Sequence, residues 1–309
     1  MKILITGGAG FIGSHLVRKL QSENVQFIVV DNLSTGSLEN LPENVSFVNL
    51  DIRKPELWDL MEKEKFDAVV HFAAQTMVNI SIDDPVNDMD ENVHGTVNVL
   101  EGAKNTGIKR IVFSSTAAAY GDVTEEQLPV KENELLQPMS FYGLSKVTAE
   151  KYLAMYHLCF GLDYVVLRFA NVYGERQGNG GEGGVISIFG KQIAQDKQIT
   201  IFGDGGQTRD FIYAGDIANG VWAALNTKNV NTVYNLSTQK ETSLLEMIKI
   251  FEQVSGKKIN PAFAAERVGD IYRSSLCNEK AKSGLDWDPQ VTLKDGLKRT
   301  YQYFNENFK

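Results

Sequence analysis

The sequence predicts an α/β fold in which a doubly wound parallel sheet is followed by a smaller mixed α/β domain. Short apolar runs alternate with stretches of helical periodicity through the first 170 residues. This alternation is typical of a parallel sheet that helices cover on both faces. A glycine-rich turn directly follows the first apolar run, and glycine becomes dense again over residues 178–184. We therefore predict two domains, residues 1–170 and 171–309, with the proviso that later segments can return to the first sheet.

The apolar runs and periodic stretches define the expected elements in chain order. Strands are expected at 2–6, 25–31, 45–50, 67–72, 109–115 and 164–169, and helices among them at 15–20, 88–104 and 141–160. The second domain is expected to hold helices at 186–195, 216–225, 243–255 and 293–307, with strands at 198–202 and 233–236. Ligands of parallel sheets collect at the carboxyl ends of the strands. Residues directly after each apolar run are therefore the first candidates for a functional site.

The first 31 residues have the pattern strand, glycine turn, helix, strand, which is the first half of a dinucleotide-binding unit. Gly7 allows the tight turn, Gly10 lets the backbone approach a pyrophosphate, and Gly13 lets the helix pack close to the strand. The helix N-terminus beyond them offers unpaired N–H groups to an anion. Asp31 ends the second strand, where a carboxylate can accept from a ribose hydroxyl. No Arg or Lys follows within residues 32–36, so NAD is favoured over NADP.

The composition argues against several classes of protein and partner. Apolar residues make up 43% of the chain, as in an ordinary globular protein. The net charge of −8 disfavours a nucleic acid or an anionic membrane as a partner. The two cysteines, Cys159 and Cys277, lie in apolar contexts, which argues against a disulfide framework and fits a reducing cytoplasm. We expect no signal peptide, no membrane span and no metal site.

A tyrosine and a lysine with helical spacing carry the predicted chemistry. Tyr142 and Lys146 are four residues apart and so face the same side of a helix. An ammonium near a phenol lowers the pKa of the phenol, which makes Tyr142 a candidate general base. Thr116, at the end of the fifth predicted strand, can hand on a proton. The alternatives are two ordinary residues of an amphipathic helix and a hydroxyl that satisfies loop backbone groups.

Further motifs complete a resemblance to a known family. They are the glycine turn, Asn92, and the stretches 31–36, 71–75, 114–116, 142–146, 168–174, 202–205, 209–211 and 267–270. Together they resemble the NAD-dependent epimerase/dehydratase family, in the extended branch of the short-chain dehydrogenases/reductases, and within it the UDP-glucose 4-epimerases. The resemblance covers essentially the whole chain. It implies a Rossmann sheet and a C-terminal domain that binds a nucleotide sugar.

The resemblance also implies roles for individual residues. Thr116, Tyr142 and Lys146 are the implied catalytic residues, and Lys146 also holds the nicotinamide ribose. The implied NAD-binding residues are Gly7, Gly10, Phe11, Ile12, Gly13, Asp31, Asn32, Ser34, Thr35, Gly36, Asp51, Ile52, Phe72, Ala73, Ala74, Gln75, Asn92, Ser114, Tyr142, Lys146 and Phe169. The implied substrate-binding residues are Thr116, Asn171, Arg209, Arg267, Asp270 and Ser274.

The reaction that the family implies is the reversible inversion of C4 of a UDP-hexose. Tyr142 removes the 4-hydroxyl proton, directly or through Thr116, as the C4 hydride passes to NAD. The 4-keto sugar turns over in the pocket and takes the hydride back on its other face. The diphosphate, held by Asn171, Arg209 and Arg267, anchors the molecule meanwhile.

Three alternatives remain open at this stage. A nucleotide-sugar 4,6-dehydratase carries Asp and Glu after the catalytic Thr, but Ala117 and Ala118 stand there. A UDP-uronate epimerase or decarboxylase needs a cation for the C6 carboxylate, for which Arg176 is a candidate. A non-catalytic NAD-binding sensor would not need Thr116, Tyr142 and Lys146 together.

The resemblance implies two finer expectations. The family residue that corresponds to Ser274 stands at the wall of the sugar pocket, and a small side chain there admits 2-acetamido sugars. UDP-GlcNAc and UDP-GalNAc are therefore expected beside UDP-Glc and UDP-Gal. The helices at 88–104 and 141–160 resemble the pair that joins two family members, so a homodimer is expected.

Overall fold

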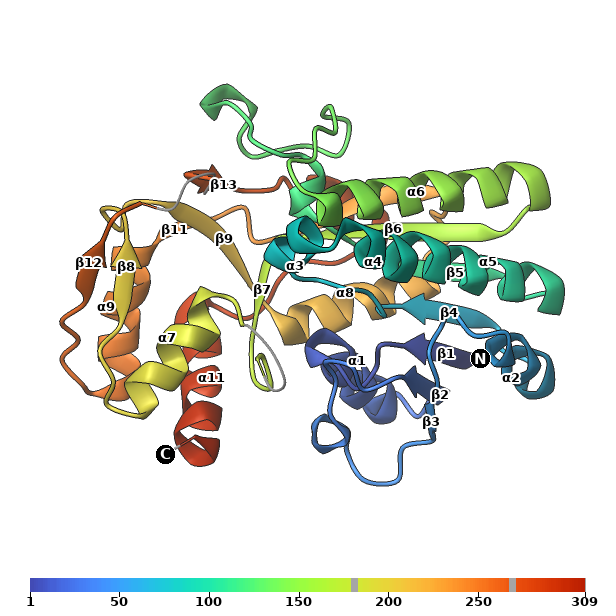
Figure 1. The fold of residues 1–309 in the computed structure, drawn as a ribbon, viewed down its shortest axis with the longest axis horizontal. Coiled ribbons are helices and arrows are strands. Elements are labelled where there is room, and N and C mark those ends of the chain that lie inside the picture. The colour runs from blue at the N-terminus through green and yellow to red at the C-terminus, as the bar shows by residue number, and fades with distance from the viewer. Residues whose placement is uncertain (179–182, 267–270, 309) are drawn as a thin grey trace.

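A computed structural model describes residues 1–178, 183–266 and 271–308. The larger lobe of the molecule is built on a seven-stranded parallel sheet (Figure 1). The strand order is β3-β2-β1-β4-β5-β6-β10, and every neighbouring pair runs parallel. The bounds are β1 (Lys2–Thr6), β2 (Gln26–Asp31), β3 (Phe47–Asn49), β4 (Ala68–His71), β5 (Arg110–Thr116), β6 (Asp163–Phe169) and β10 (Thr232–Leu236). The predicted parallel α/β fold is confirmed.

Helices cover both faces of this sheet, as the apolar runs of the central strands require. On one face α1 (Phe11–Ser22) packs beside α8 (Ala214–Asn226), and both contribute to one core cluster. On the other face α2 (Glu56–Glu64), α5 (Gly95–Thr106) and α6 (Phe141–Phe160) contribute to a second cluster. The reversal of strand order between β1 and β4 opens a crevice at the carboxyl ends of the strands.

The predicted helix at 88–104 is helical throughout, but it is not a regular α-helix. It comprises the end of α4 (Pro85–Met89), a π-helical turn at Asp90–His94 and most of α5, and the short α3 (Val78–Asp83) precedes it. π-helical turns are rare and occur mostly at functional sites. Asn92 lies in this turn, and its side chain points inward.

The smaller lobe lies to one side of the sheet and has its own core (Figure 1). Its helices include α7 (Val185–Ala194), α9 (Leu244–Ser255) and α11 (Leu293–Asn307). Two small sheets complete it, one from β7 (Asn171–Tyr173), β9 (Thr208–Tyr213), β11 (Glu241–Ser243) and β13 (Arg273–Ser274), and one from β8 (Thr200–Phe202) and β12 (Ala262–Ala264). The predicted strand at 198–202 contains β8, whereas β7, β9, β11, β12 and β13 were not predicted. Four of these five have only two or three residues, and runs so short carry no readable periodicity.

The chain beyond residue 170 does not stay in the smaller lobe. The strand β10 pairs with β6 in the large sheet, α8 packs on α1, and α10 (Glu279–Leu285) packs near β10. The division after residue 170 stays a prediction about domains, but these three elements belong to the larger lobe. Cys159 is exposed, Cys277 is buried, and both are free thiols. Within the described residues, no helix combines the length and apolarity that a membrane crossing requires.

Candidate active site

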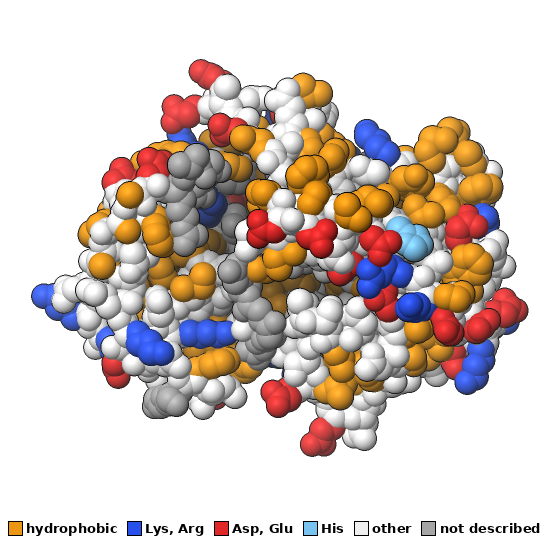
Figure 2. Space-filling view, viewed as in Figure 1, with side chains coloured by type: hydrophobic (Ala, Val, Ile, Leu, Met, Phe, Trp, Pro, Cys, Tyr) orange, Lys and Arg blue, Asp and Glu red, His pale blue; other side chains and the backbone are white. Residues whose placement is uncertain are grey.

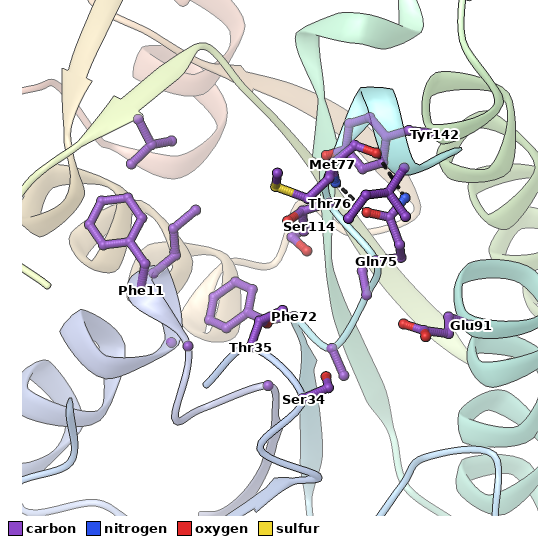
Figure 3. A pocket seen from close by; sticks show the side chains of 18 of the residues that line it. Phe11, Ser34, Thr35, Phe72, Gln75, Thr76, Met77, Glu91, Ser114 and Tyr142 are labelled. Atoms are coloured by element: carbon purple, nitrogen blue, oxygen red, sulfur yellow. Dashed lines mark hydrogen bonds between the residues drawn. The ribbon is translucent and has the colours of Figure 1, made fainter. Parts of the chain in front are cut away.

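A pocket of about 710 Å³ lies at the carboxyl ends of the parallel strands and extends toward the smaller lobe (Figure 3). Phe11 and Phe72 lie on the side of the glycine turn, and Tyr142 and Met77 lie together at the other end. The predicted site residues that line it are Gly7, Gly10, Phe11, Ile12, Gly13, Asp31, Asn32, Ser34, Thr35, Asp51, Ile52, Phe72, Ala73, Ala74, Gln75, Ser114, Tyr142, Lys146, Phe169 and Asn171. One pocket thus brings together residues from segments spread along the chain between Gly7 and Asn171.

The glycine turn forms a cradle that only glycine can build. Gly7 has a φ of +71°, and a Cβ there would lie 2.5 Å from the backbone nitrogen of Ala73. A Cβ on Gly13 would lie 2.3 Å from the carbonyl oxygen of Gly7. Gly10 is the N-cap of α1, and no side chain caps this helix. The N-terminus of α1 therefore faces the pocket without a competing acceptor, which suits the diphosphate of a dinucleotide.

Asp31 connects the glycine turn to the loop that follows β2. Its carboxylate accepts the backbone N–H of Ala9 at 3.0 Å and that of Leu33 at 2.8 Å. Burial raises the pKa of Asp31, and these two backbone donors oppose the rise. Gly36 does not line the pocket, but it packs against Asp31 and Ala9 and so supports the same wall.

Arg53 is a pocket residue that the sequence argument missed. Its guanidinium donates to Asp51 Oδ2 at 2.6 Å and to Asp90 Oδ2 at 2.7 Å, while Asn32 Nδ2 donates to Asp51 at 3.1 Å. The arginine holds the pKa of Asp51 well below its ordinary value. Because two carboxylates already pair with Arg53, its charge does not undermine the predicted preference for NAD. Only the fold brings it there, since it is remote in sequence from Asp31.

The catalytic candidates meet at the end of β5 and the first turns of α6. Ser140 caps α6 by accepting the backbone N–H of Gly143 at 3.1 Å, which fixes where the helix begins. Lys146 is 4% exposed, and its Nζ donates to the carbonyl oxygen of Ser114 at 3.1 Å. Burial lowers the pKa of Lys146 to about 8. Thr116 ends β5, and its hydroxyl accepts the backbone N–H of Ala118 at 3.1 Å.

The predicted effect of Lys146 on Tyr142 is wrong for this arrangement. Burial raises the pKa of Tyr142, and Asp88 adds to the rise. A hydrogen bond with Thr116 is what opposes it. The reason is that Lys146 is turned to the Ser114 carbonyl, so desolvation dominates at the phenol. Thr116 is thereby placed next to Tyr142, as the sequence argument expected.

Gln75 lines the pocket, but the side-chain amides of Gln75 and Asn92 are bonded to other protein groups. The Gln75 amide donates to the Met77 carbonyl at 3.0 Å and to Asp88 at 2.8 Å, and it accepts the Met77 backbone N–H. Asn92 is 2% exposed and lies behind the lining, where it bonds the backbone of Gln75 and the hydroxyl of Ser145. Their amide groups are therefore already occupied by protein partners.

The predicted substrate residues of the smaller lobe lie on adjacent strands. Ser274 of β13 is in register with Arg209 of β9, and Arg209 donates to the Thr208 carbonyl at 2.8 Å. A second cavity of about 180 Å³ lies nearby, and it is lined by Phe202, Gly203, Asp204, Gln207, Glu266, Ile271 and Tyr272. Arg267 and Asp270 lie outside the described residues. Arg176 lines the large pocket, but its Nε donates to Ser14 Oγ on α1 at 2.8 Å.

The parallel sheet, the glycine cradle and the tyrosine and lysine of α6 define a dinucleotide-binding protein of the extended short-chain dehydrogenase/reductase class. The sequence comparison then assigns the family. Residues 3–237 match the NAD-dependent epimerase/dehydratase family, and the chain belongs to it. The predicted cofactor, NAD, is confirmed at the level of the family.

Individual relatives match over nearly their whole length. The UDP-glucose 4-epimerase of Mycolicibacterium smegmatis is 36% identical, with 98% of each chain covered. The crystal structure of the Thermotoga maritima UDP-glucose 4-epimerase with UDP-glucose is 39% identical, with a TM-score of 0.96 and 100% of each chain covered. The UDP-N-acetylglucosamine 4-epimerase of Methanobrevibacter ruminantium, in complex with UDP-N-acetylmuramic acid, is 32% identical, with a TM-score of 0.93 and coverages of 99% and 98%.

Proposed function

We propose that the protein catalyses the reversible C4 epimerisation of a UDP-hexose with bound NAD. The observation that carries this proposal is that Tyr142 and Lys146 line the same pocket as the glycine cradle, with Thr116 hydrogen-bonded to Tyr142. A cofactor that accepts a hydride and a base that accepts a proton, both beside an open volume, suit the oxidation of a secondary alcohol. The epimerases among the similar proteins support the choice of reaction.

The chain supplies binding and proton transfer to this reaction. When bound, NAD would supply the hydride acceptor for this oxidation. Tyr142 accepts the proton of the 4-hydroxyl, directly or through Thr116, and returns a proton after the sugar has turned over. Thr116 stabilises the phenolate by its hydrogen bond, and the Lys146 ammonium holds the ribose side of the site. Asn171, Arg209, Arg267 and Asp270 are proposed to anchor the UDP portion.

Two neighbouring reactions are less well supported by the residues present. Ala117 and Ala118 follow Thr116 in a 3₁₀ turn, so no acid and base stand there for elimination of water, as a 4,6-dehydratase needs. Arg176 could serve the carboxylate of a uronate, but its guanidinium is directed to Ser14 at the cofactor side. A uronate epimerase therefore ranks second.

The test measures turnover of a panel of UDP-sugars by the purified protein. The first reaction to measure is the interconversion of UDP-glucose and UDP-galactose. Tyr142→Phe should lower kcat by about a hundredfold or more, because the general base is lost, and should retain NAD. Near-normal turnover in this variant refutes the assignment of the base. No turnover on any sugar by the wild type, with NAD bound, favours a sensor instead.

We further propose that Ser274 leaves the sugar pocket open for a 2-acetamido group. The serine is half-buried on β13 beside Arg209, and the acetamido-sugar epimerase among the similar structures supports this breadth. Ser274→Tyr should raise the barrier for UDP-GlcNAc by about 1–3 kcal/mol through overpacking and spare UDP-galactose. Equal losses on both sugars, or no wild-type turnover of acetamido sugars, place the limit elsewhere.

We also propose a cytoplasmic homodimer. Large apolar side chains are exposed along α6, at Leu144, Tyr152, Met155 and Leu158, and along α3 and α4 (Figure 2). A contiguous apolar surface of this kind marks an interface between proteins. Met155→Glu with Leu158→Glu should give a monomer in light scattering coupled to size exclusion, whereas Lys298→Glu, at an exposed position of α11 in the smaller lobe, should not. A wild-type monomer at micromolar concentration contradicts the proposal.

A further inference from the structure

Asp88 is a buried acid next to the catalytic residues for which the proposed reaction has no role so far. It lies on α4 and is 1% exposed. Its Oδ1 accepts from Gln75 Nε2 at 2.8 Å and from Asn92 Nδ2 at 3.1 Å. Its Oδ2 is buried and has no hydrogen-bond partner. Burying a polar atom without a partner costs free energy, so the retained acid requires an explanation.

The amides of Gln75 and Asn92, which Asp88 accepts from, support the pocket wall beside α6. Gln75 closes a tight loop through both backbone groups of Met77, and Met77 lies beside Tyr142 in the pocket (Figure 3). Asn92 in turn bonds the backbone of Gln75 and the hydroxyl of Ser145, the residue that precedes Lys146. A chain of contacts therefore runs from Asp88 to the pocket loop on one side and to the catalytic helix on the other.

Asp88 also interacts electrostatically with Lys146. Among the described residues Lys146 forms no ion pair within 4.0 Å, and Asp88 is the charged group that most favours its ammonium form. Glu150 also favours the ammonium, but it is paired with Arg168 of β6 at 2.6 Å. On β4, burial lowers the pKa of His71 to about 3, so this imidazole is neutral.

The remaining charges near Asp88 are matched by other partners. On the π-helical turn, Asp90 pairs with Arg53 and His94, and Glu91 accepts from Asn87 of α4. Tyr142, on α6, is the other titratable group that Asp88 influences. The buried charge at this end of the pocket is thus the Asp88 carboxylate against the Lys146 ammonium.

We propose that Asp88 is a positioning residue of the active site, which holds Gln75 and Asn92 in place and supplies the counter-charge of Lys146. The inference rests on the proposed epimerase function for its kinetic consequence but not for its structural one. As a carboxylate, Asp88 favours the ammonium form of Lys146 and disfavours a resting phenolate at Tyr142. The proton then stays on Tyr142 until substrate and cofactor are both in place.

Asp88→Asn separates the two roles of this residue. The amide oxygen can still accept from Gln75 and Asn92, so the wall keeps its hydrogen bonds while the charge disappears. Removing a negative charge lowers the pKa of Lys146 and of Tyr142 alike. Activity that needs a deprotonated Tyr142 and a protonated Lys146 has a bell-shaped pH profile. Both limbs of that profile should move to lower pH, by at least about half a pH unit.

The experiment measures kcat and kcat/KM from pH 5.5 to 10 for the wild type, Asp88→Asn, Asp88→Ala and Asp84→Asn. Asp84 lies on the surface at the start of the same helix, so its variant controls for a general change of charge. Asp88→Asn should shift both limbs with little change in thermal midpoint. Asp88→Ala should shift them and also lower the midpoint, because two amides lose their acceptor. Asp84→Asn should change neither.

An ultraviolet titration of tyrosinate, with Tyr142→Phe as the subtracted background, gives the same comparison without turnover. If Asp88→Asn does not fold, Asp88→Ser provides a neutral acceptor in its place. An unshifted pH profile and an unshifted titration in the neutral variant overturn the proposal, because the charge of Asp88 then has no effect on the pKa of Tyr142 or Lys146. Absence of wild-type turnover on every UDP-sugar refutes the proposed function, while the titration still decides the role of Asp88.

Discussion

Replacing Glu150 by Gln tests whether the catalytic helix is fixed by a buried ion pair. Glu150 lies one turn beyond Lys146 on α6, and its carboxylate accepts from Arg168 Nη2 at 2.6 Å and from Arg168 Nε at 3.0 Å. The two side chains are 5% and 4% exposed. The same carboxylate accepts from Ser115, and Arg168 also donates to the Tyr120 hydroxyl at 2.9 Å. The pair therefore joins α6 to β5 and β6.

The expected cost follows from this burial. Breaking a buried pair leaves one uncompensated charge, which costs about 3–5 kcal/mol. Glu150→Gln keeps the size of the side chain, so the loss measures the charge and not a cavity. Arg168→Gln should cost a similar amount, and the double variant should cost clearly less than the sum of the two, because no unpaired charge remains.

Urea-induced unfolding, followed by fluorescence, measures these free energies of unfolding. Glu23→Gln is the matched control, since Glu23 pairs with Lys19 at 2.6 Å on the exposed side of α1. That pair should contribute less than about 0.5 kcal/mol. A loss below about 1 kcal/mol for Glu150→Gln, or full additivity in the double variant, refutes the reasoning.

Two further predictions concern the cofactor cradle and the pH dependence of stability. Gly13→Ala should weaken NAD binding at least about tenfold in calorimetry, because its Cβ meets two backbone groups at 2.3 and 2.7 Å that cannot move aside cheaply, and unchanged affinity would show that the turn is not a cradle. Burial lowers the pKa of His15 and of His71 to about 3, against about 6.5 in the unfolded chain. Since the unfolded state binds these protons first, their contribution to stability is complete above pH 6.5 and is lost as the pH falls, by about 1.4 kcal/mol per pH unit for each histidine. Urea unfolding between pH 6.5 and 5 should show this slope, and His71→Gln should reduce it by about half; an unchanged slope in that variant contradicts the assignment.

The local elements of this protein follow from sequence periodicity. The apolar runs of β1, β2, β4, β5 and β6 and the long periodic stretch of α6 are located correctly to within a few residues. The glycine turn with Asp31, and Tyr142 with Lys146, are also local patterns whose spacing is set by one turn or one helix. The predictions of the family and of the fold class rest on such local patterns together with further short motifs along the chain, and both are confirmed.

Tertiary structure decided the features that join distant segments. It brought Arg53 to Asp90, placed β10 beside β6, and turned the amides of Gln75 and Asn92 toward Asp88. It also reversed the expected shift at Tyr142, because burial raises the pKa of this phenol more than its hydrogen bond with Thr116 lowers it. Spacing along the chain determines which side chains share a face. Desolvation and contact between remote segments exist only after folding, and they determine how those side chains are charged and bonded.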